Sequence, residues 1–141
     1  MTINQISIFL ENKYGKLNDL FLLLSKENIR IIAATVADTS EFGILRMIVS
    51  NAQKAHKLLK NNNVNANLTE VLAISMPSTT NSFADVMSHF TKAGLSIEYM
   101  YCFSYKEKSV LILRTNNRES ALDVIRKQHL NYITENDLLD L

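Results

Sequence analysis

Apolar residues recur in the same order twice along the chain, at a displacement of 66 residues. In each half, four of them fall at positions i, i+3, i+4 and i+7, which is the spacing of one buried face of a helix. After each predicted helix comes a turn and then an alternation of apolar and polar residues, which predicts a strand with one buried face. Such repetition indicates a duplicated unit. The two helical sets are Leu17, Leu20, Phe21 and Leu24, and then Phe83, Val86, Met87 and Phe90.

The repetition extends to a second helix and to further strands in each half. Ser50 with Gln53, and Asn116 with Glu119, have the spacing of a capping box, so these pairs predict the starts of the second helices. The order in each half is therefore strand, helix, strand, strand, helix, strand. The predicted strands cover residues 3–9, 28–31, 44–49 and 64–68 in the first half, and residues 71–75, 94–97, 110–115 and 130–133 in the second.

This order predicts an α+β fold of two tandem ferredoxin-like βαββαβ modules, residues 1–68 and 69–141. In each module both helices cover one face of four antiparallel strands. A module of about 66 residues gains little stability from its own core, so we expect the two modules to be joined. A joint eight-stranded antiparallel sheet, made by pairing edge strands, would also protect those edges from stray pairing.

The composition narrows the classes of function. Among 141 residues, 15 Lys and Arg offset 14 Asp and Glu to a formal charge of +1, which is too small to attract nucleic acid or an anionic membrane. No run reaches the roughly 18 apolar residues of a membrane helix, and the first ten residues lack the basic start of a signal peptide, so we expect a soluble cytoplasmic protein. Cys102 is the single cysteine, and without a basic neighbour in its strand we expect it to be a buried or half-buried apolar residue instead of a nucleophile. The histidines have no zinc-ligand spacing. We therefore expect no metal, no cofactor and no catalytic residues.

Two stretches of the chain resemble the ACT domain, a small amino-acid-sensing module. One runs from Phe9 through Gly15 to the start of the first helix, and the other is Glu27 to Ile31. Residues 37–46 and 97–101 look like parts of free-standing tandem ACT proteins, so the resemblance covers the whole chain. It implies a non-catalytic regulatory or sensor protein that binds a free amino acid at the interface between two ACT modules. The contacts implied are the loop before a first helix and the second strand of the neighbouring module.

The chain departs from the family pattern in both loops. Tyr14 stands where the family usually has proline, and Asn81 replaces the glycine of the second loop. Glycine at position 15 allows a positive φ without steric cost, whereas asparagine at position 81 can adopt one only at some cost, so the first loop is predicted to be the better site. Its free amides at the helix start suit a carboxylate.

The candidate ligand-binding residues lie in the first loop and in the second strand of the second half. Tyr99 and Tyr101 could instead be core residues beneath the helices, because they share strand parity with Ile97. Residues around a turn between two strands form a second tier, together with the second-loop asparagine. The first tier is Asn12, Lys13, Tyr14, Gly15, Lys16, Leu17, Tyr99, Met100 and Tyr101, and the second tier is Asp38, Thr39, Arg46 and Asn81.

A different class of function stays open. Loss of the second-loop glycine favours a protein–protein interaction module, or a regulatory subunit with a vestigial ligand pocket. In either case we expect a homodimer and a partner enzyme or regulator, and the tyrosines favour histidine or another flat or polar amino acid over a branched aliphatic one. RNA binding is disfavoured because the strand from Val110 to Arg114 lacks the aromatic and basic residues of an RNA-recognition sheet.

Overall fold

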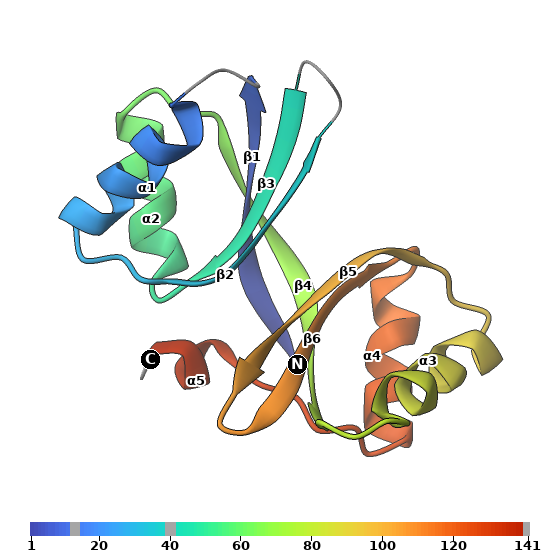
Figure 1. The fold of residues 1–141 in the computed structure, drawn as a ribbon. Helices are drawn as coiled ribbons and strands as arrows, with labels where there is room; N and C mark the ends of the chain where they lie inside the picture. The colour runs from blue at the N-terminus through green and yellow to red at the C-terminus, as the bar shows by residue number, and fades with distance from the viewer. Residues whose placement is uncertain (12–14, 39–41, 140–141) are drawn as a thin grey trace. The chain divides into compact units, whose positions relative to one another are not determined.

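The computed structural model describes residues 1–11, 15–38 and 42–139 (Figure 1). The chain divides into two compact units. The N-terminal unit comprises Asn4–Glu70 together with the residues from Asn136 onward, and the C-terminal unit comprises Met1–Ile3 and Val71–Glu135. The predicted boundary between the modules, after residue 68, falls inside a strand that runs from Ala66 to Pro77. The division into modules 1–68 and 69–141 stays a prediction.

The N-terminal unit is a layer of two helices on one face of a sheet. Its elements are β1 (Thr2–Glu11), α1 (Lys16–Lys26), β2 (Ile31–Asp38), β3 (Phe42–Val49), α2 (Ala52–Asn61) and the first part of β4 (Ala66–Pro77). The hydrogen-bonded strand order is β2-β3-β1-β4, and β3 is antiparallel to both β2 and β1. Figure 1 shows α1 and α2 against the same face of β1 and β3. The core between these layers contains Ile6, Ile8, Leu20, Leu24, Leu45, Met47, Ala55 and Leu59.

The C-terminal unit repeats this arrangement. Its elements are the second part of β4, α3 (Ser82–Lys92), β5 (Ile97–Tyr105), β6 (Lys108–Thr115), α4 (Arg118–Lys127) and a short helix, α5 (Glu135–Leu139), whose last residues belong to the N-terminal unit. β6 lies between β4 and β5 and is antiparallel to both. The periodicity predicts α3 and α4, but it does not predict α5. The core contains Leu72, Ile74, Val86, Phe90, Leu111, Leu113, Ala121 and Ile125.

The described residues form six strands, in the order β2-β3-β1-β4-β6-β5, where the sequence predicts eight. One reason is that the predicted strands 64–68 and 71–75 are a single strand, β4, because neither Pro nor Gly separates them. The other is that the predicted strand 130–133 makes only one bridge, Tyr132 with Ile74. Two segments share the hydrogen-bonding groups of β4 at Ala73. Ala73 N–H donates to the Met1 carbonyl at 3.4 Å, and Ile133 N–H donates to the Ala73 carbonyl at 3.1 Å.

The second helices begin one residue later than the predicted capping boxes. Asn51 caps α2 by accepting a hydrogen bond from Lys54 N–H at 3.1 Å, and Asn117 caps α4 in the same way through Ser120 N–H at 3.1 Å. Ser50 Oγ instead accepts from Arg30 N–H at 3.0 Å. This bond connects the end of β3 to the segment before β2, and Asn116 with Ser96 makes its equivalent in the C-terminal unit at 3.0 Å. The prediction that Ser50 and Asn116 cap the second helices is therefore wrong. The two residues are still equivalent in the repeat, because each accepts a hydrogen bond from the segment before a strand.

The cap assignment predicts a difference in stability between two neighbouring substitutions. Asn51→Ala removes the side chain that satisfies Lys54 N–H, so the free energy of unfolding should fall by about 1 kcal/mol. Gln53→Ala, a residue of the predicted capping box, should change it by less than about 0.5 kcal/mol. Urea denaturation of both variants measures this. An equal or larger loss for Gln53→Ala would contradict the assignment.

Candidate ligand-binding site

The turn into α1 depends on a left-handed residue. Gly15 precedes the helix with φ of 82°, a conformation in which side chains other than glycine are strained. A Cβ added at Gly15 would have no heavy atom of the described residues within 4 Å, so that part of the chain leaves space beside this backbone. The first helical hydrogen bond runs from Asp19 N–H to the Gly15 carbonyl at 2.9 Å. The N–H groups of Lys16, Leu17 and Asn18 therefore lie ahead of the first intrahelical bond, at the positive end of the helix dipole.

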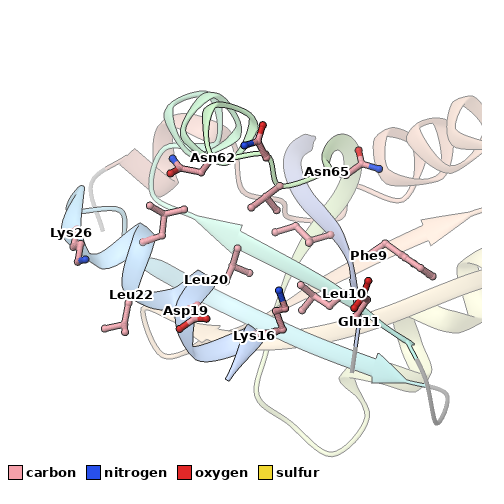
Figure 2. A pocket seen from close by; sticks show the side chains of 14 residues that line it. Phe9, Leu10, Glu11, Lys16, Asp19, Leu20, Leu22, Lys26, Asn62 and Asn65 are labelled. Atoms are coloured by element: carbon pink, nitrogen blue, oxygen red, sulfur yellow. The ribbon is translucent and has the colours of Figure 1, made fainter. Parts of the chain in front are cut away.

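A groove of about 690 Å³ lies beside this turn, within the N-terminal unit. Three segments line it: residues 8–11 at the end of β1, one side of α1, and the loop of residues 62–65 between α2 and β4. Figure 2 shows α1 and the asparagine-containing loop on opposite sides of the groove, with the end of β1 between them. Lys16, the residue after Gly15, is one of the lining residues, so the groove begins at the helix start.

The groove combines an apolar floor with charges near the helix start. Ile8 and Leu20 are 1% and 5% exposed, and they belong to the core of the unit. Lys16 and Asp19 are exposed residues of the first helical turns that line the same groove. Asn62 uses its side-chain amide to donate to the Leu58 carbonyl at 2.8 Å, which fixes the start of the loop. A ligand with an apolar part and two opposite charges fits these surroundings.

Three of the first-tier residues come together at the helix start, and three lie outside the described part of the chain. Gly15, Lys16 and Leu17 are consecutive, but Leu17 packs against the core instead of lining the groove. Asn12, Lys13 and Tyr14 precede them and are not among the described residues, and neither is Thr39 of the second tier.

The tyrosines of β5 lie on the face of their sheet away from the helices. The pairing register of β5 with β6 shifts by one residue between Ile97 and Tyr99. Tyr99 therefore pairs with Arg114, and Tyr101 pairs with Ile112. A bulge of this kind reverses which face the following side chains occupy. Tyr99 and Tyr101 therefore do not lie beneath α3 and α4, although their parity with Ile97 in the sequence allowed that interpretation.

Met100 and Cys102 alternate with the tyrosines and lie on the other face of β5. They pair with Leu113 and Leu111, which belong to the core. Both are exposed, because β5 is the edge strand of its unit. The sequence predicts Cys102 to be a buried or half-buried apolar residue, and this is wrong: an edge position leaves its thiol exposed. These residues belong to the C-terminal unit, whereas Gly15 and the groove belong to the N-terminal unit.

The second-tier residues are dispersed. Asp38 is the last residue of β2, where it pairs with Gly43. Arg46 lies in β3 and pairs with Ser7 and Thr35. Its neighbours Leu45 and Met47 belong to the core, so Arg46 lies on the face away from the helices.

The second loop has a different structure from the first. Asn81 has φ of −95°, so it does not adopt the left-handed conformation of Gly15. The hydroxyl of Ser82 donates to the Pro77 carbonyl at 2.5 Å, and its oxygen lies 2.7 Å from the hydroxyl of Thr79. Ser82 is buried, and its N–H bonds to the Thr79 carbonyl at 3.3 Å. The side chains of this loop thus hydrogen-bond within the loop, where the first loop has its left-handed glycine.

Other classes of site receive no support from the described residues. None of the helices in this part of the chain is long and apolar enough to cross a membrane. Across residues 1–11, 15–38 and 42–139, no three His, Cys, Asp or Glu side chains gather as metal ligands would.

The sequence did not indicate the groove. Its lining includes Asp19, Asn62 and Asn65, which are not among the predicted site residues. The asparagine run between α2 and β4 resembles a connecting loop, and nothing in it shows that β1 ends beside it. The usable signal is the repeat itself, because two of the four charged residues of the groove have uncharged equivalents 66 residues later: Glu11 corresponds to Pro77, and Lys16 to Ser82. Asp19 and Lys26 keep their charge as Asp85 and Lys92.

Comparison with known proteins agrees with this fold. A family model described as an ACT domain pair matches residues 1–141. The crystal structure of protein BT0572 from Bacteroides thetaiotaomicron is 38% identical, with a TM-score of 0.93 over 100% of this chain and 98% of that chain. The ligand-free regulatory subunit of aspartate kinase from Thermus thermophilus is 16% identical, with a TM-score of 0.61 over 90% of this chain and 94% of that chain. No functionally curated protein matches significantly. The chain belongs to the family of ACT domain pairs, a regulatory module.

Proposed function

We propose that this protein is a non-catalytic regulator that binds a free amino acid at the start of α1. The observation that carries the proposal is the left-handed Gly15, with open space around it, next to a groove that begins at Lys16. Helix amides ahead of the first intrahelical bond are suited to a carboxylate. Membership in a family of regulatory modules supports the same role.

The energetics favour this end of the helix. A carboxylate near the N-terminal dipole gains about 0.3–1 kcal/mol, and a charge-assisted hydrogen bond adds about 1.5–3 kcal/mol. These terms fall short of the roughly 8 kcal/mol of a micromolar ligand, so burial of the ligand's side chain has to supply the rest. The groove offers the apolar surface for it.

The regulatory action that we propose is coupling. An amino acid that binds one arrangement of the protein more tightly than another shifts the equilibrium between them by its difference in affinity, typically about 1–3 kcal/mol. We propose that the amino acid changes one of two association equilibria in the cytoplasm, either homodimer formation or the binding of a partner enzyme or regulator. In such a dimer, Tyr99, Met100 and Tyr101 of a second copy are candidates to complete the site.

A second candidate function is a protein–protein interaction module with a vestigial pocket. The hydroxyl network at Thr79 and Ser82 favours it for the C-terminal unit, because that loop satisfies its own hydrogen bonds. Partner capture that is indifferent to every amino acid would support this function over sensing.

Calorimetric titration of the full chain with each of the twenty amino acids tests the proposal. We expect saturable heat for at least one of them at concentrations up to millimolar, with about one ligand per chain because a left-handed residue precedes α1 but not α3. Absence of saturable heat for all twenty would contradict amino-acid sensing.

Gly15→Val should abolish that binding, because a β-branched side chain strains the left-handed backbone and blocks the approach to the amides. Gly94→Val is the matched control, since Gly94 also has a positive φ, 73°, and open space around it, but lies after α3. Each variant should lose about 1–2 kcal/mol of unfolding free energy. Only Gly15→Val should lose the calorimetric signal, and retained affinity would refute the choice of loop.

A further inference from the structure

We propose that the groove beside α1 selects an amino acid with an aliphatic side chain of about leucine size. This inference rests on the proposed function and adds the chemical class of the ligand. It differs from the expectation of histidine, which depended on the tyrosines of β5.

The floor of the groove is aliphatic, and Asn62, Asn63 and Asn65 border it on the side of the loop before β4. Ile8 and Leu10 supply it from β1, Leu20 and Leu23 from α1, and Val64 from the loop before β4. Phe9 also borders the groove, but Figure 2 shows its ring directed away from the α1 side chains. A ligand side chain on this floor therefore meets branched aliphatic groups, which reward the burial of methyl and methylene groups and penalise an unpaired polar atom.

Four charged residues border this floor: Glu11 at the end of β1, Lys16 and Asp19 in the first turns of α1, and Lys26 at the end of α1. Lys16 and Asp19 are three residues apart in the first turns of α1, so they lie on neighbouring positions of the helix surface. Within the residues that the structure describes, neither side chain forms an ion pair. Lys16 with the helix amides suits the carboxylate of an amino acid, and Asp19 suits its ammonium group. Both charges lie at the helix start, so the ligand's side chain extends along α1 toward Leu20 and Leu23.

The repeat shows that the fold requires neither Lys16 nor Leu23, although it keeps the carboxylate, because Asp85 is the equivalent of Asp19. At the equivalent positions of the C-terminal unit, Ser82 replaces Lys16 and His89 replaces Leu23, while apolar Val86 still stands for Leu20. α3 forms and packs on its sheet with these residues. The cation and the aliphatic residue are therefore features of the groove, since the same helix is stable without them.

This comparison supplies variants that should fold. Leu23→His installs the residue that the C-terminal unit already has at the equivalent position, and His89→Leu is the reverse change in the other unit. The first places a polar ring on the floor of the groove, and the second leaves the groove unchanged. Circular dichroism and thermal unfolding confirm that both variants fold.

Calorimetric titration of the full chain with leucine, alanine and histidine tests the inference. Leucine should bind roughly tenfold or more tightly than alanine, because its additional carbons contact the floor, and histidine should bind more weakly than leucine. Leu23→His should reduce the affinity for leucine roughly tenfold and leave that for alanine within about twofold. The His89→Leu variant should match the unmodified protein for all three ligands.

The outcomes separate this inference from the proposed function. Equal affinities for leucine and alanine, tighter binding of histidine, or an undiminished preference in Leu23→His would overturn the aliphatic groove and leave amino-acid binding at Gly15 intact. No binding of any of the twenty amino acids would overturn the proposed function and the inference together.

Discussion

The left-handed backbone at Gly15 is the constraint on which the site depends. It ends the turn from β1 in such a way that α1 begins with three amides ahead of its first hydrogen bond, beside the groove at Lys16. A residue with a Cβ would be strained there, and among the described residues no packing contact requires the glycine. The conformation of the backbone is therefore the feature that glycine provides, and it is the feature a ligand's carboxylate would use.

The two halves of the chain separate what the fold needs from what the site needs. Asn28 and Gly94 are both left-handed at the ends of α1 and α3, and Asn63 and His129 are both left-handed after α2 and α4. The bonds made by Ser50 and Asn116 also recur. These shared features stop helices and align strands, so any copy of the module requires them.

The loops before α1 and α3 do not follow this rule. Gly15 has a positive φ and its equivalent Asn81 does not, and the hydroxyls of Thr79 and Ser82 hydrogen-bond to each other before α3. A fold requirement would have kept both loops alike. Their divergence is the expected result when one copy keeps a ligand site and the other copy uses local hydrogen bonds for stability.

The sequence predicted the helices and the order of elements well, because both follow from periodicity, and the displacement of 66 residues doubled each signal. The strands predicted over 28–31 and 94–97 begin only at Ile31 and Ile97, as β2 and β5, because a turn and extended residues precede them. It could not predict the bulge after Ile97, which reverses the faces of Tyr99 and Tyr101, because a single extra residue leaves no mark in composition. It also missed α5, which is too short for a periodic pattern, and the groove, whose lining is assembled from three separated segments. Gly15 could be predicted as a site residue because glycine is the residue type that adopts the left-handed conformation without strain.

Two-dimensional NMR of the uniformly ¹⁵N-labelled full chain, titrated with leucine, tests the central claim most directly. The account predicts saturable shifts of the amide signals of Gly15, Lys16 and Leu17, with smaller shifts at Leu23 and Val64, and no shift at the equivalent residues Asn81, Ser82 and Phe83. Shifts confined to residues 81–83, or saturable shifts that leave residues 15–17 unchanged, would contradict it.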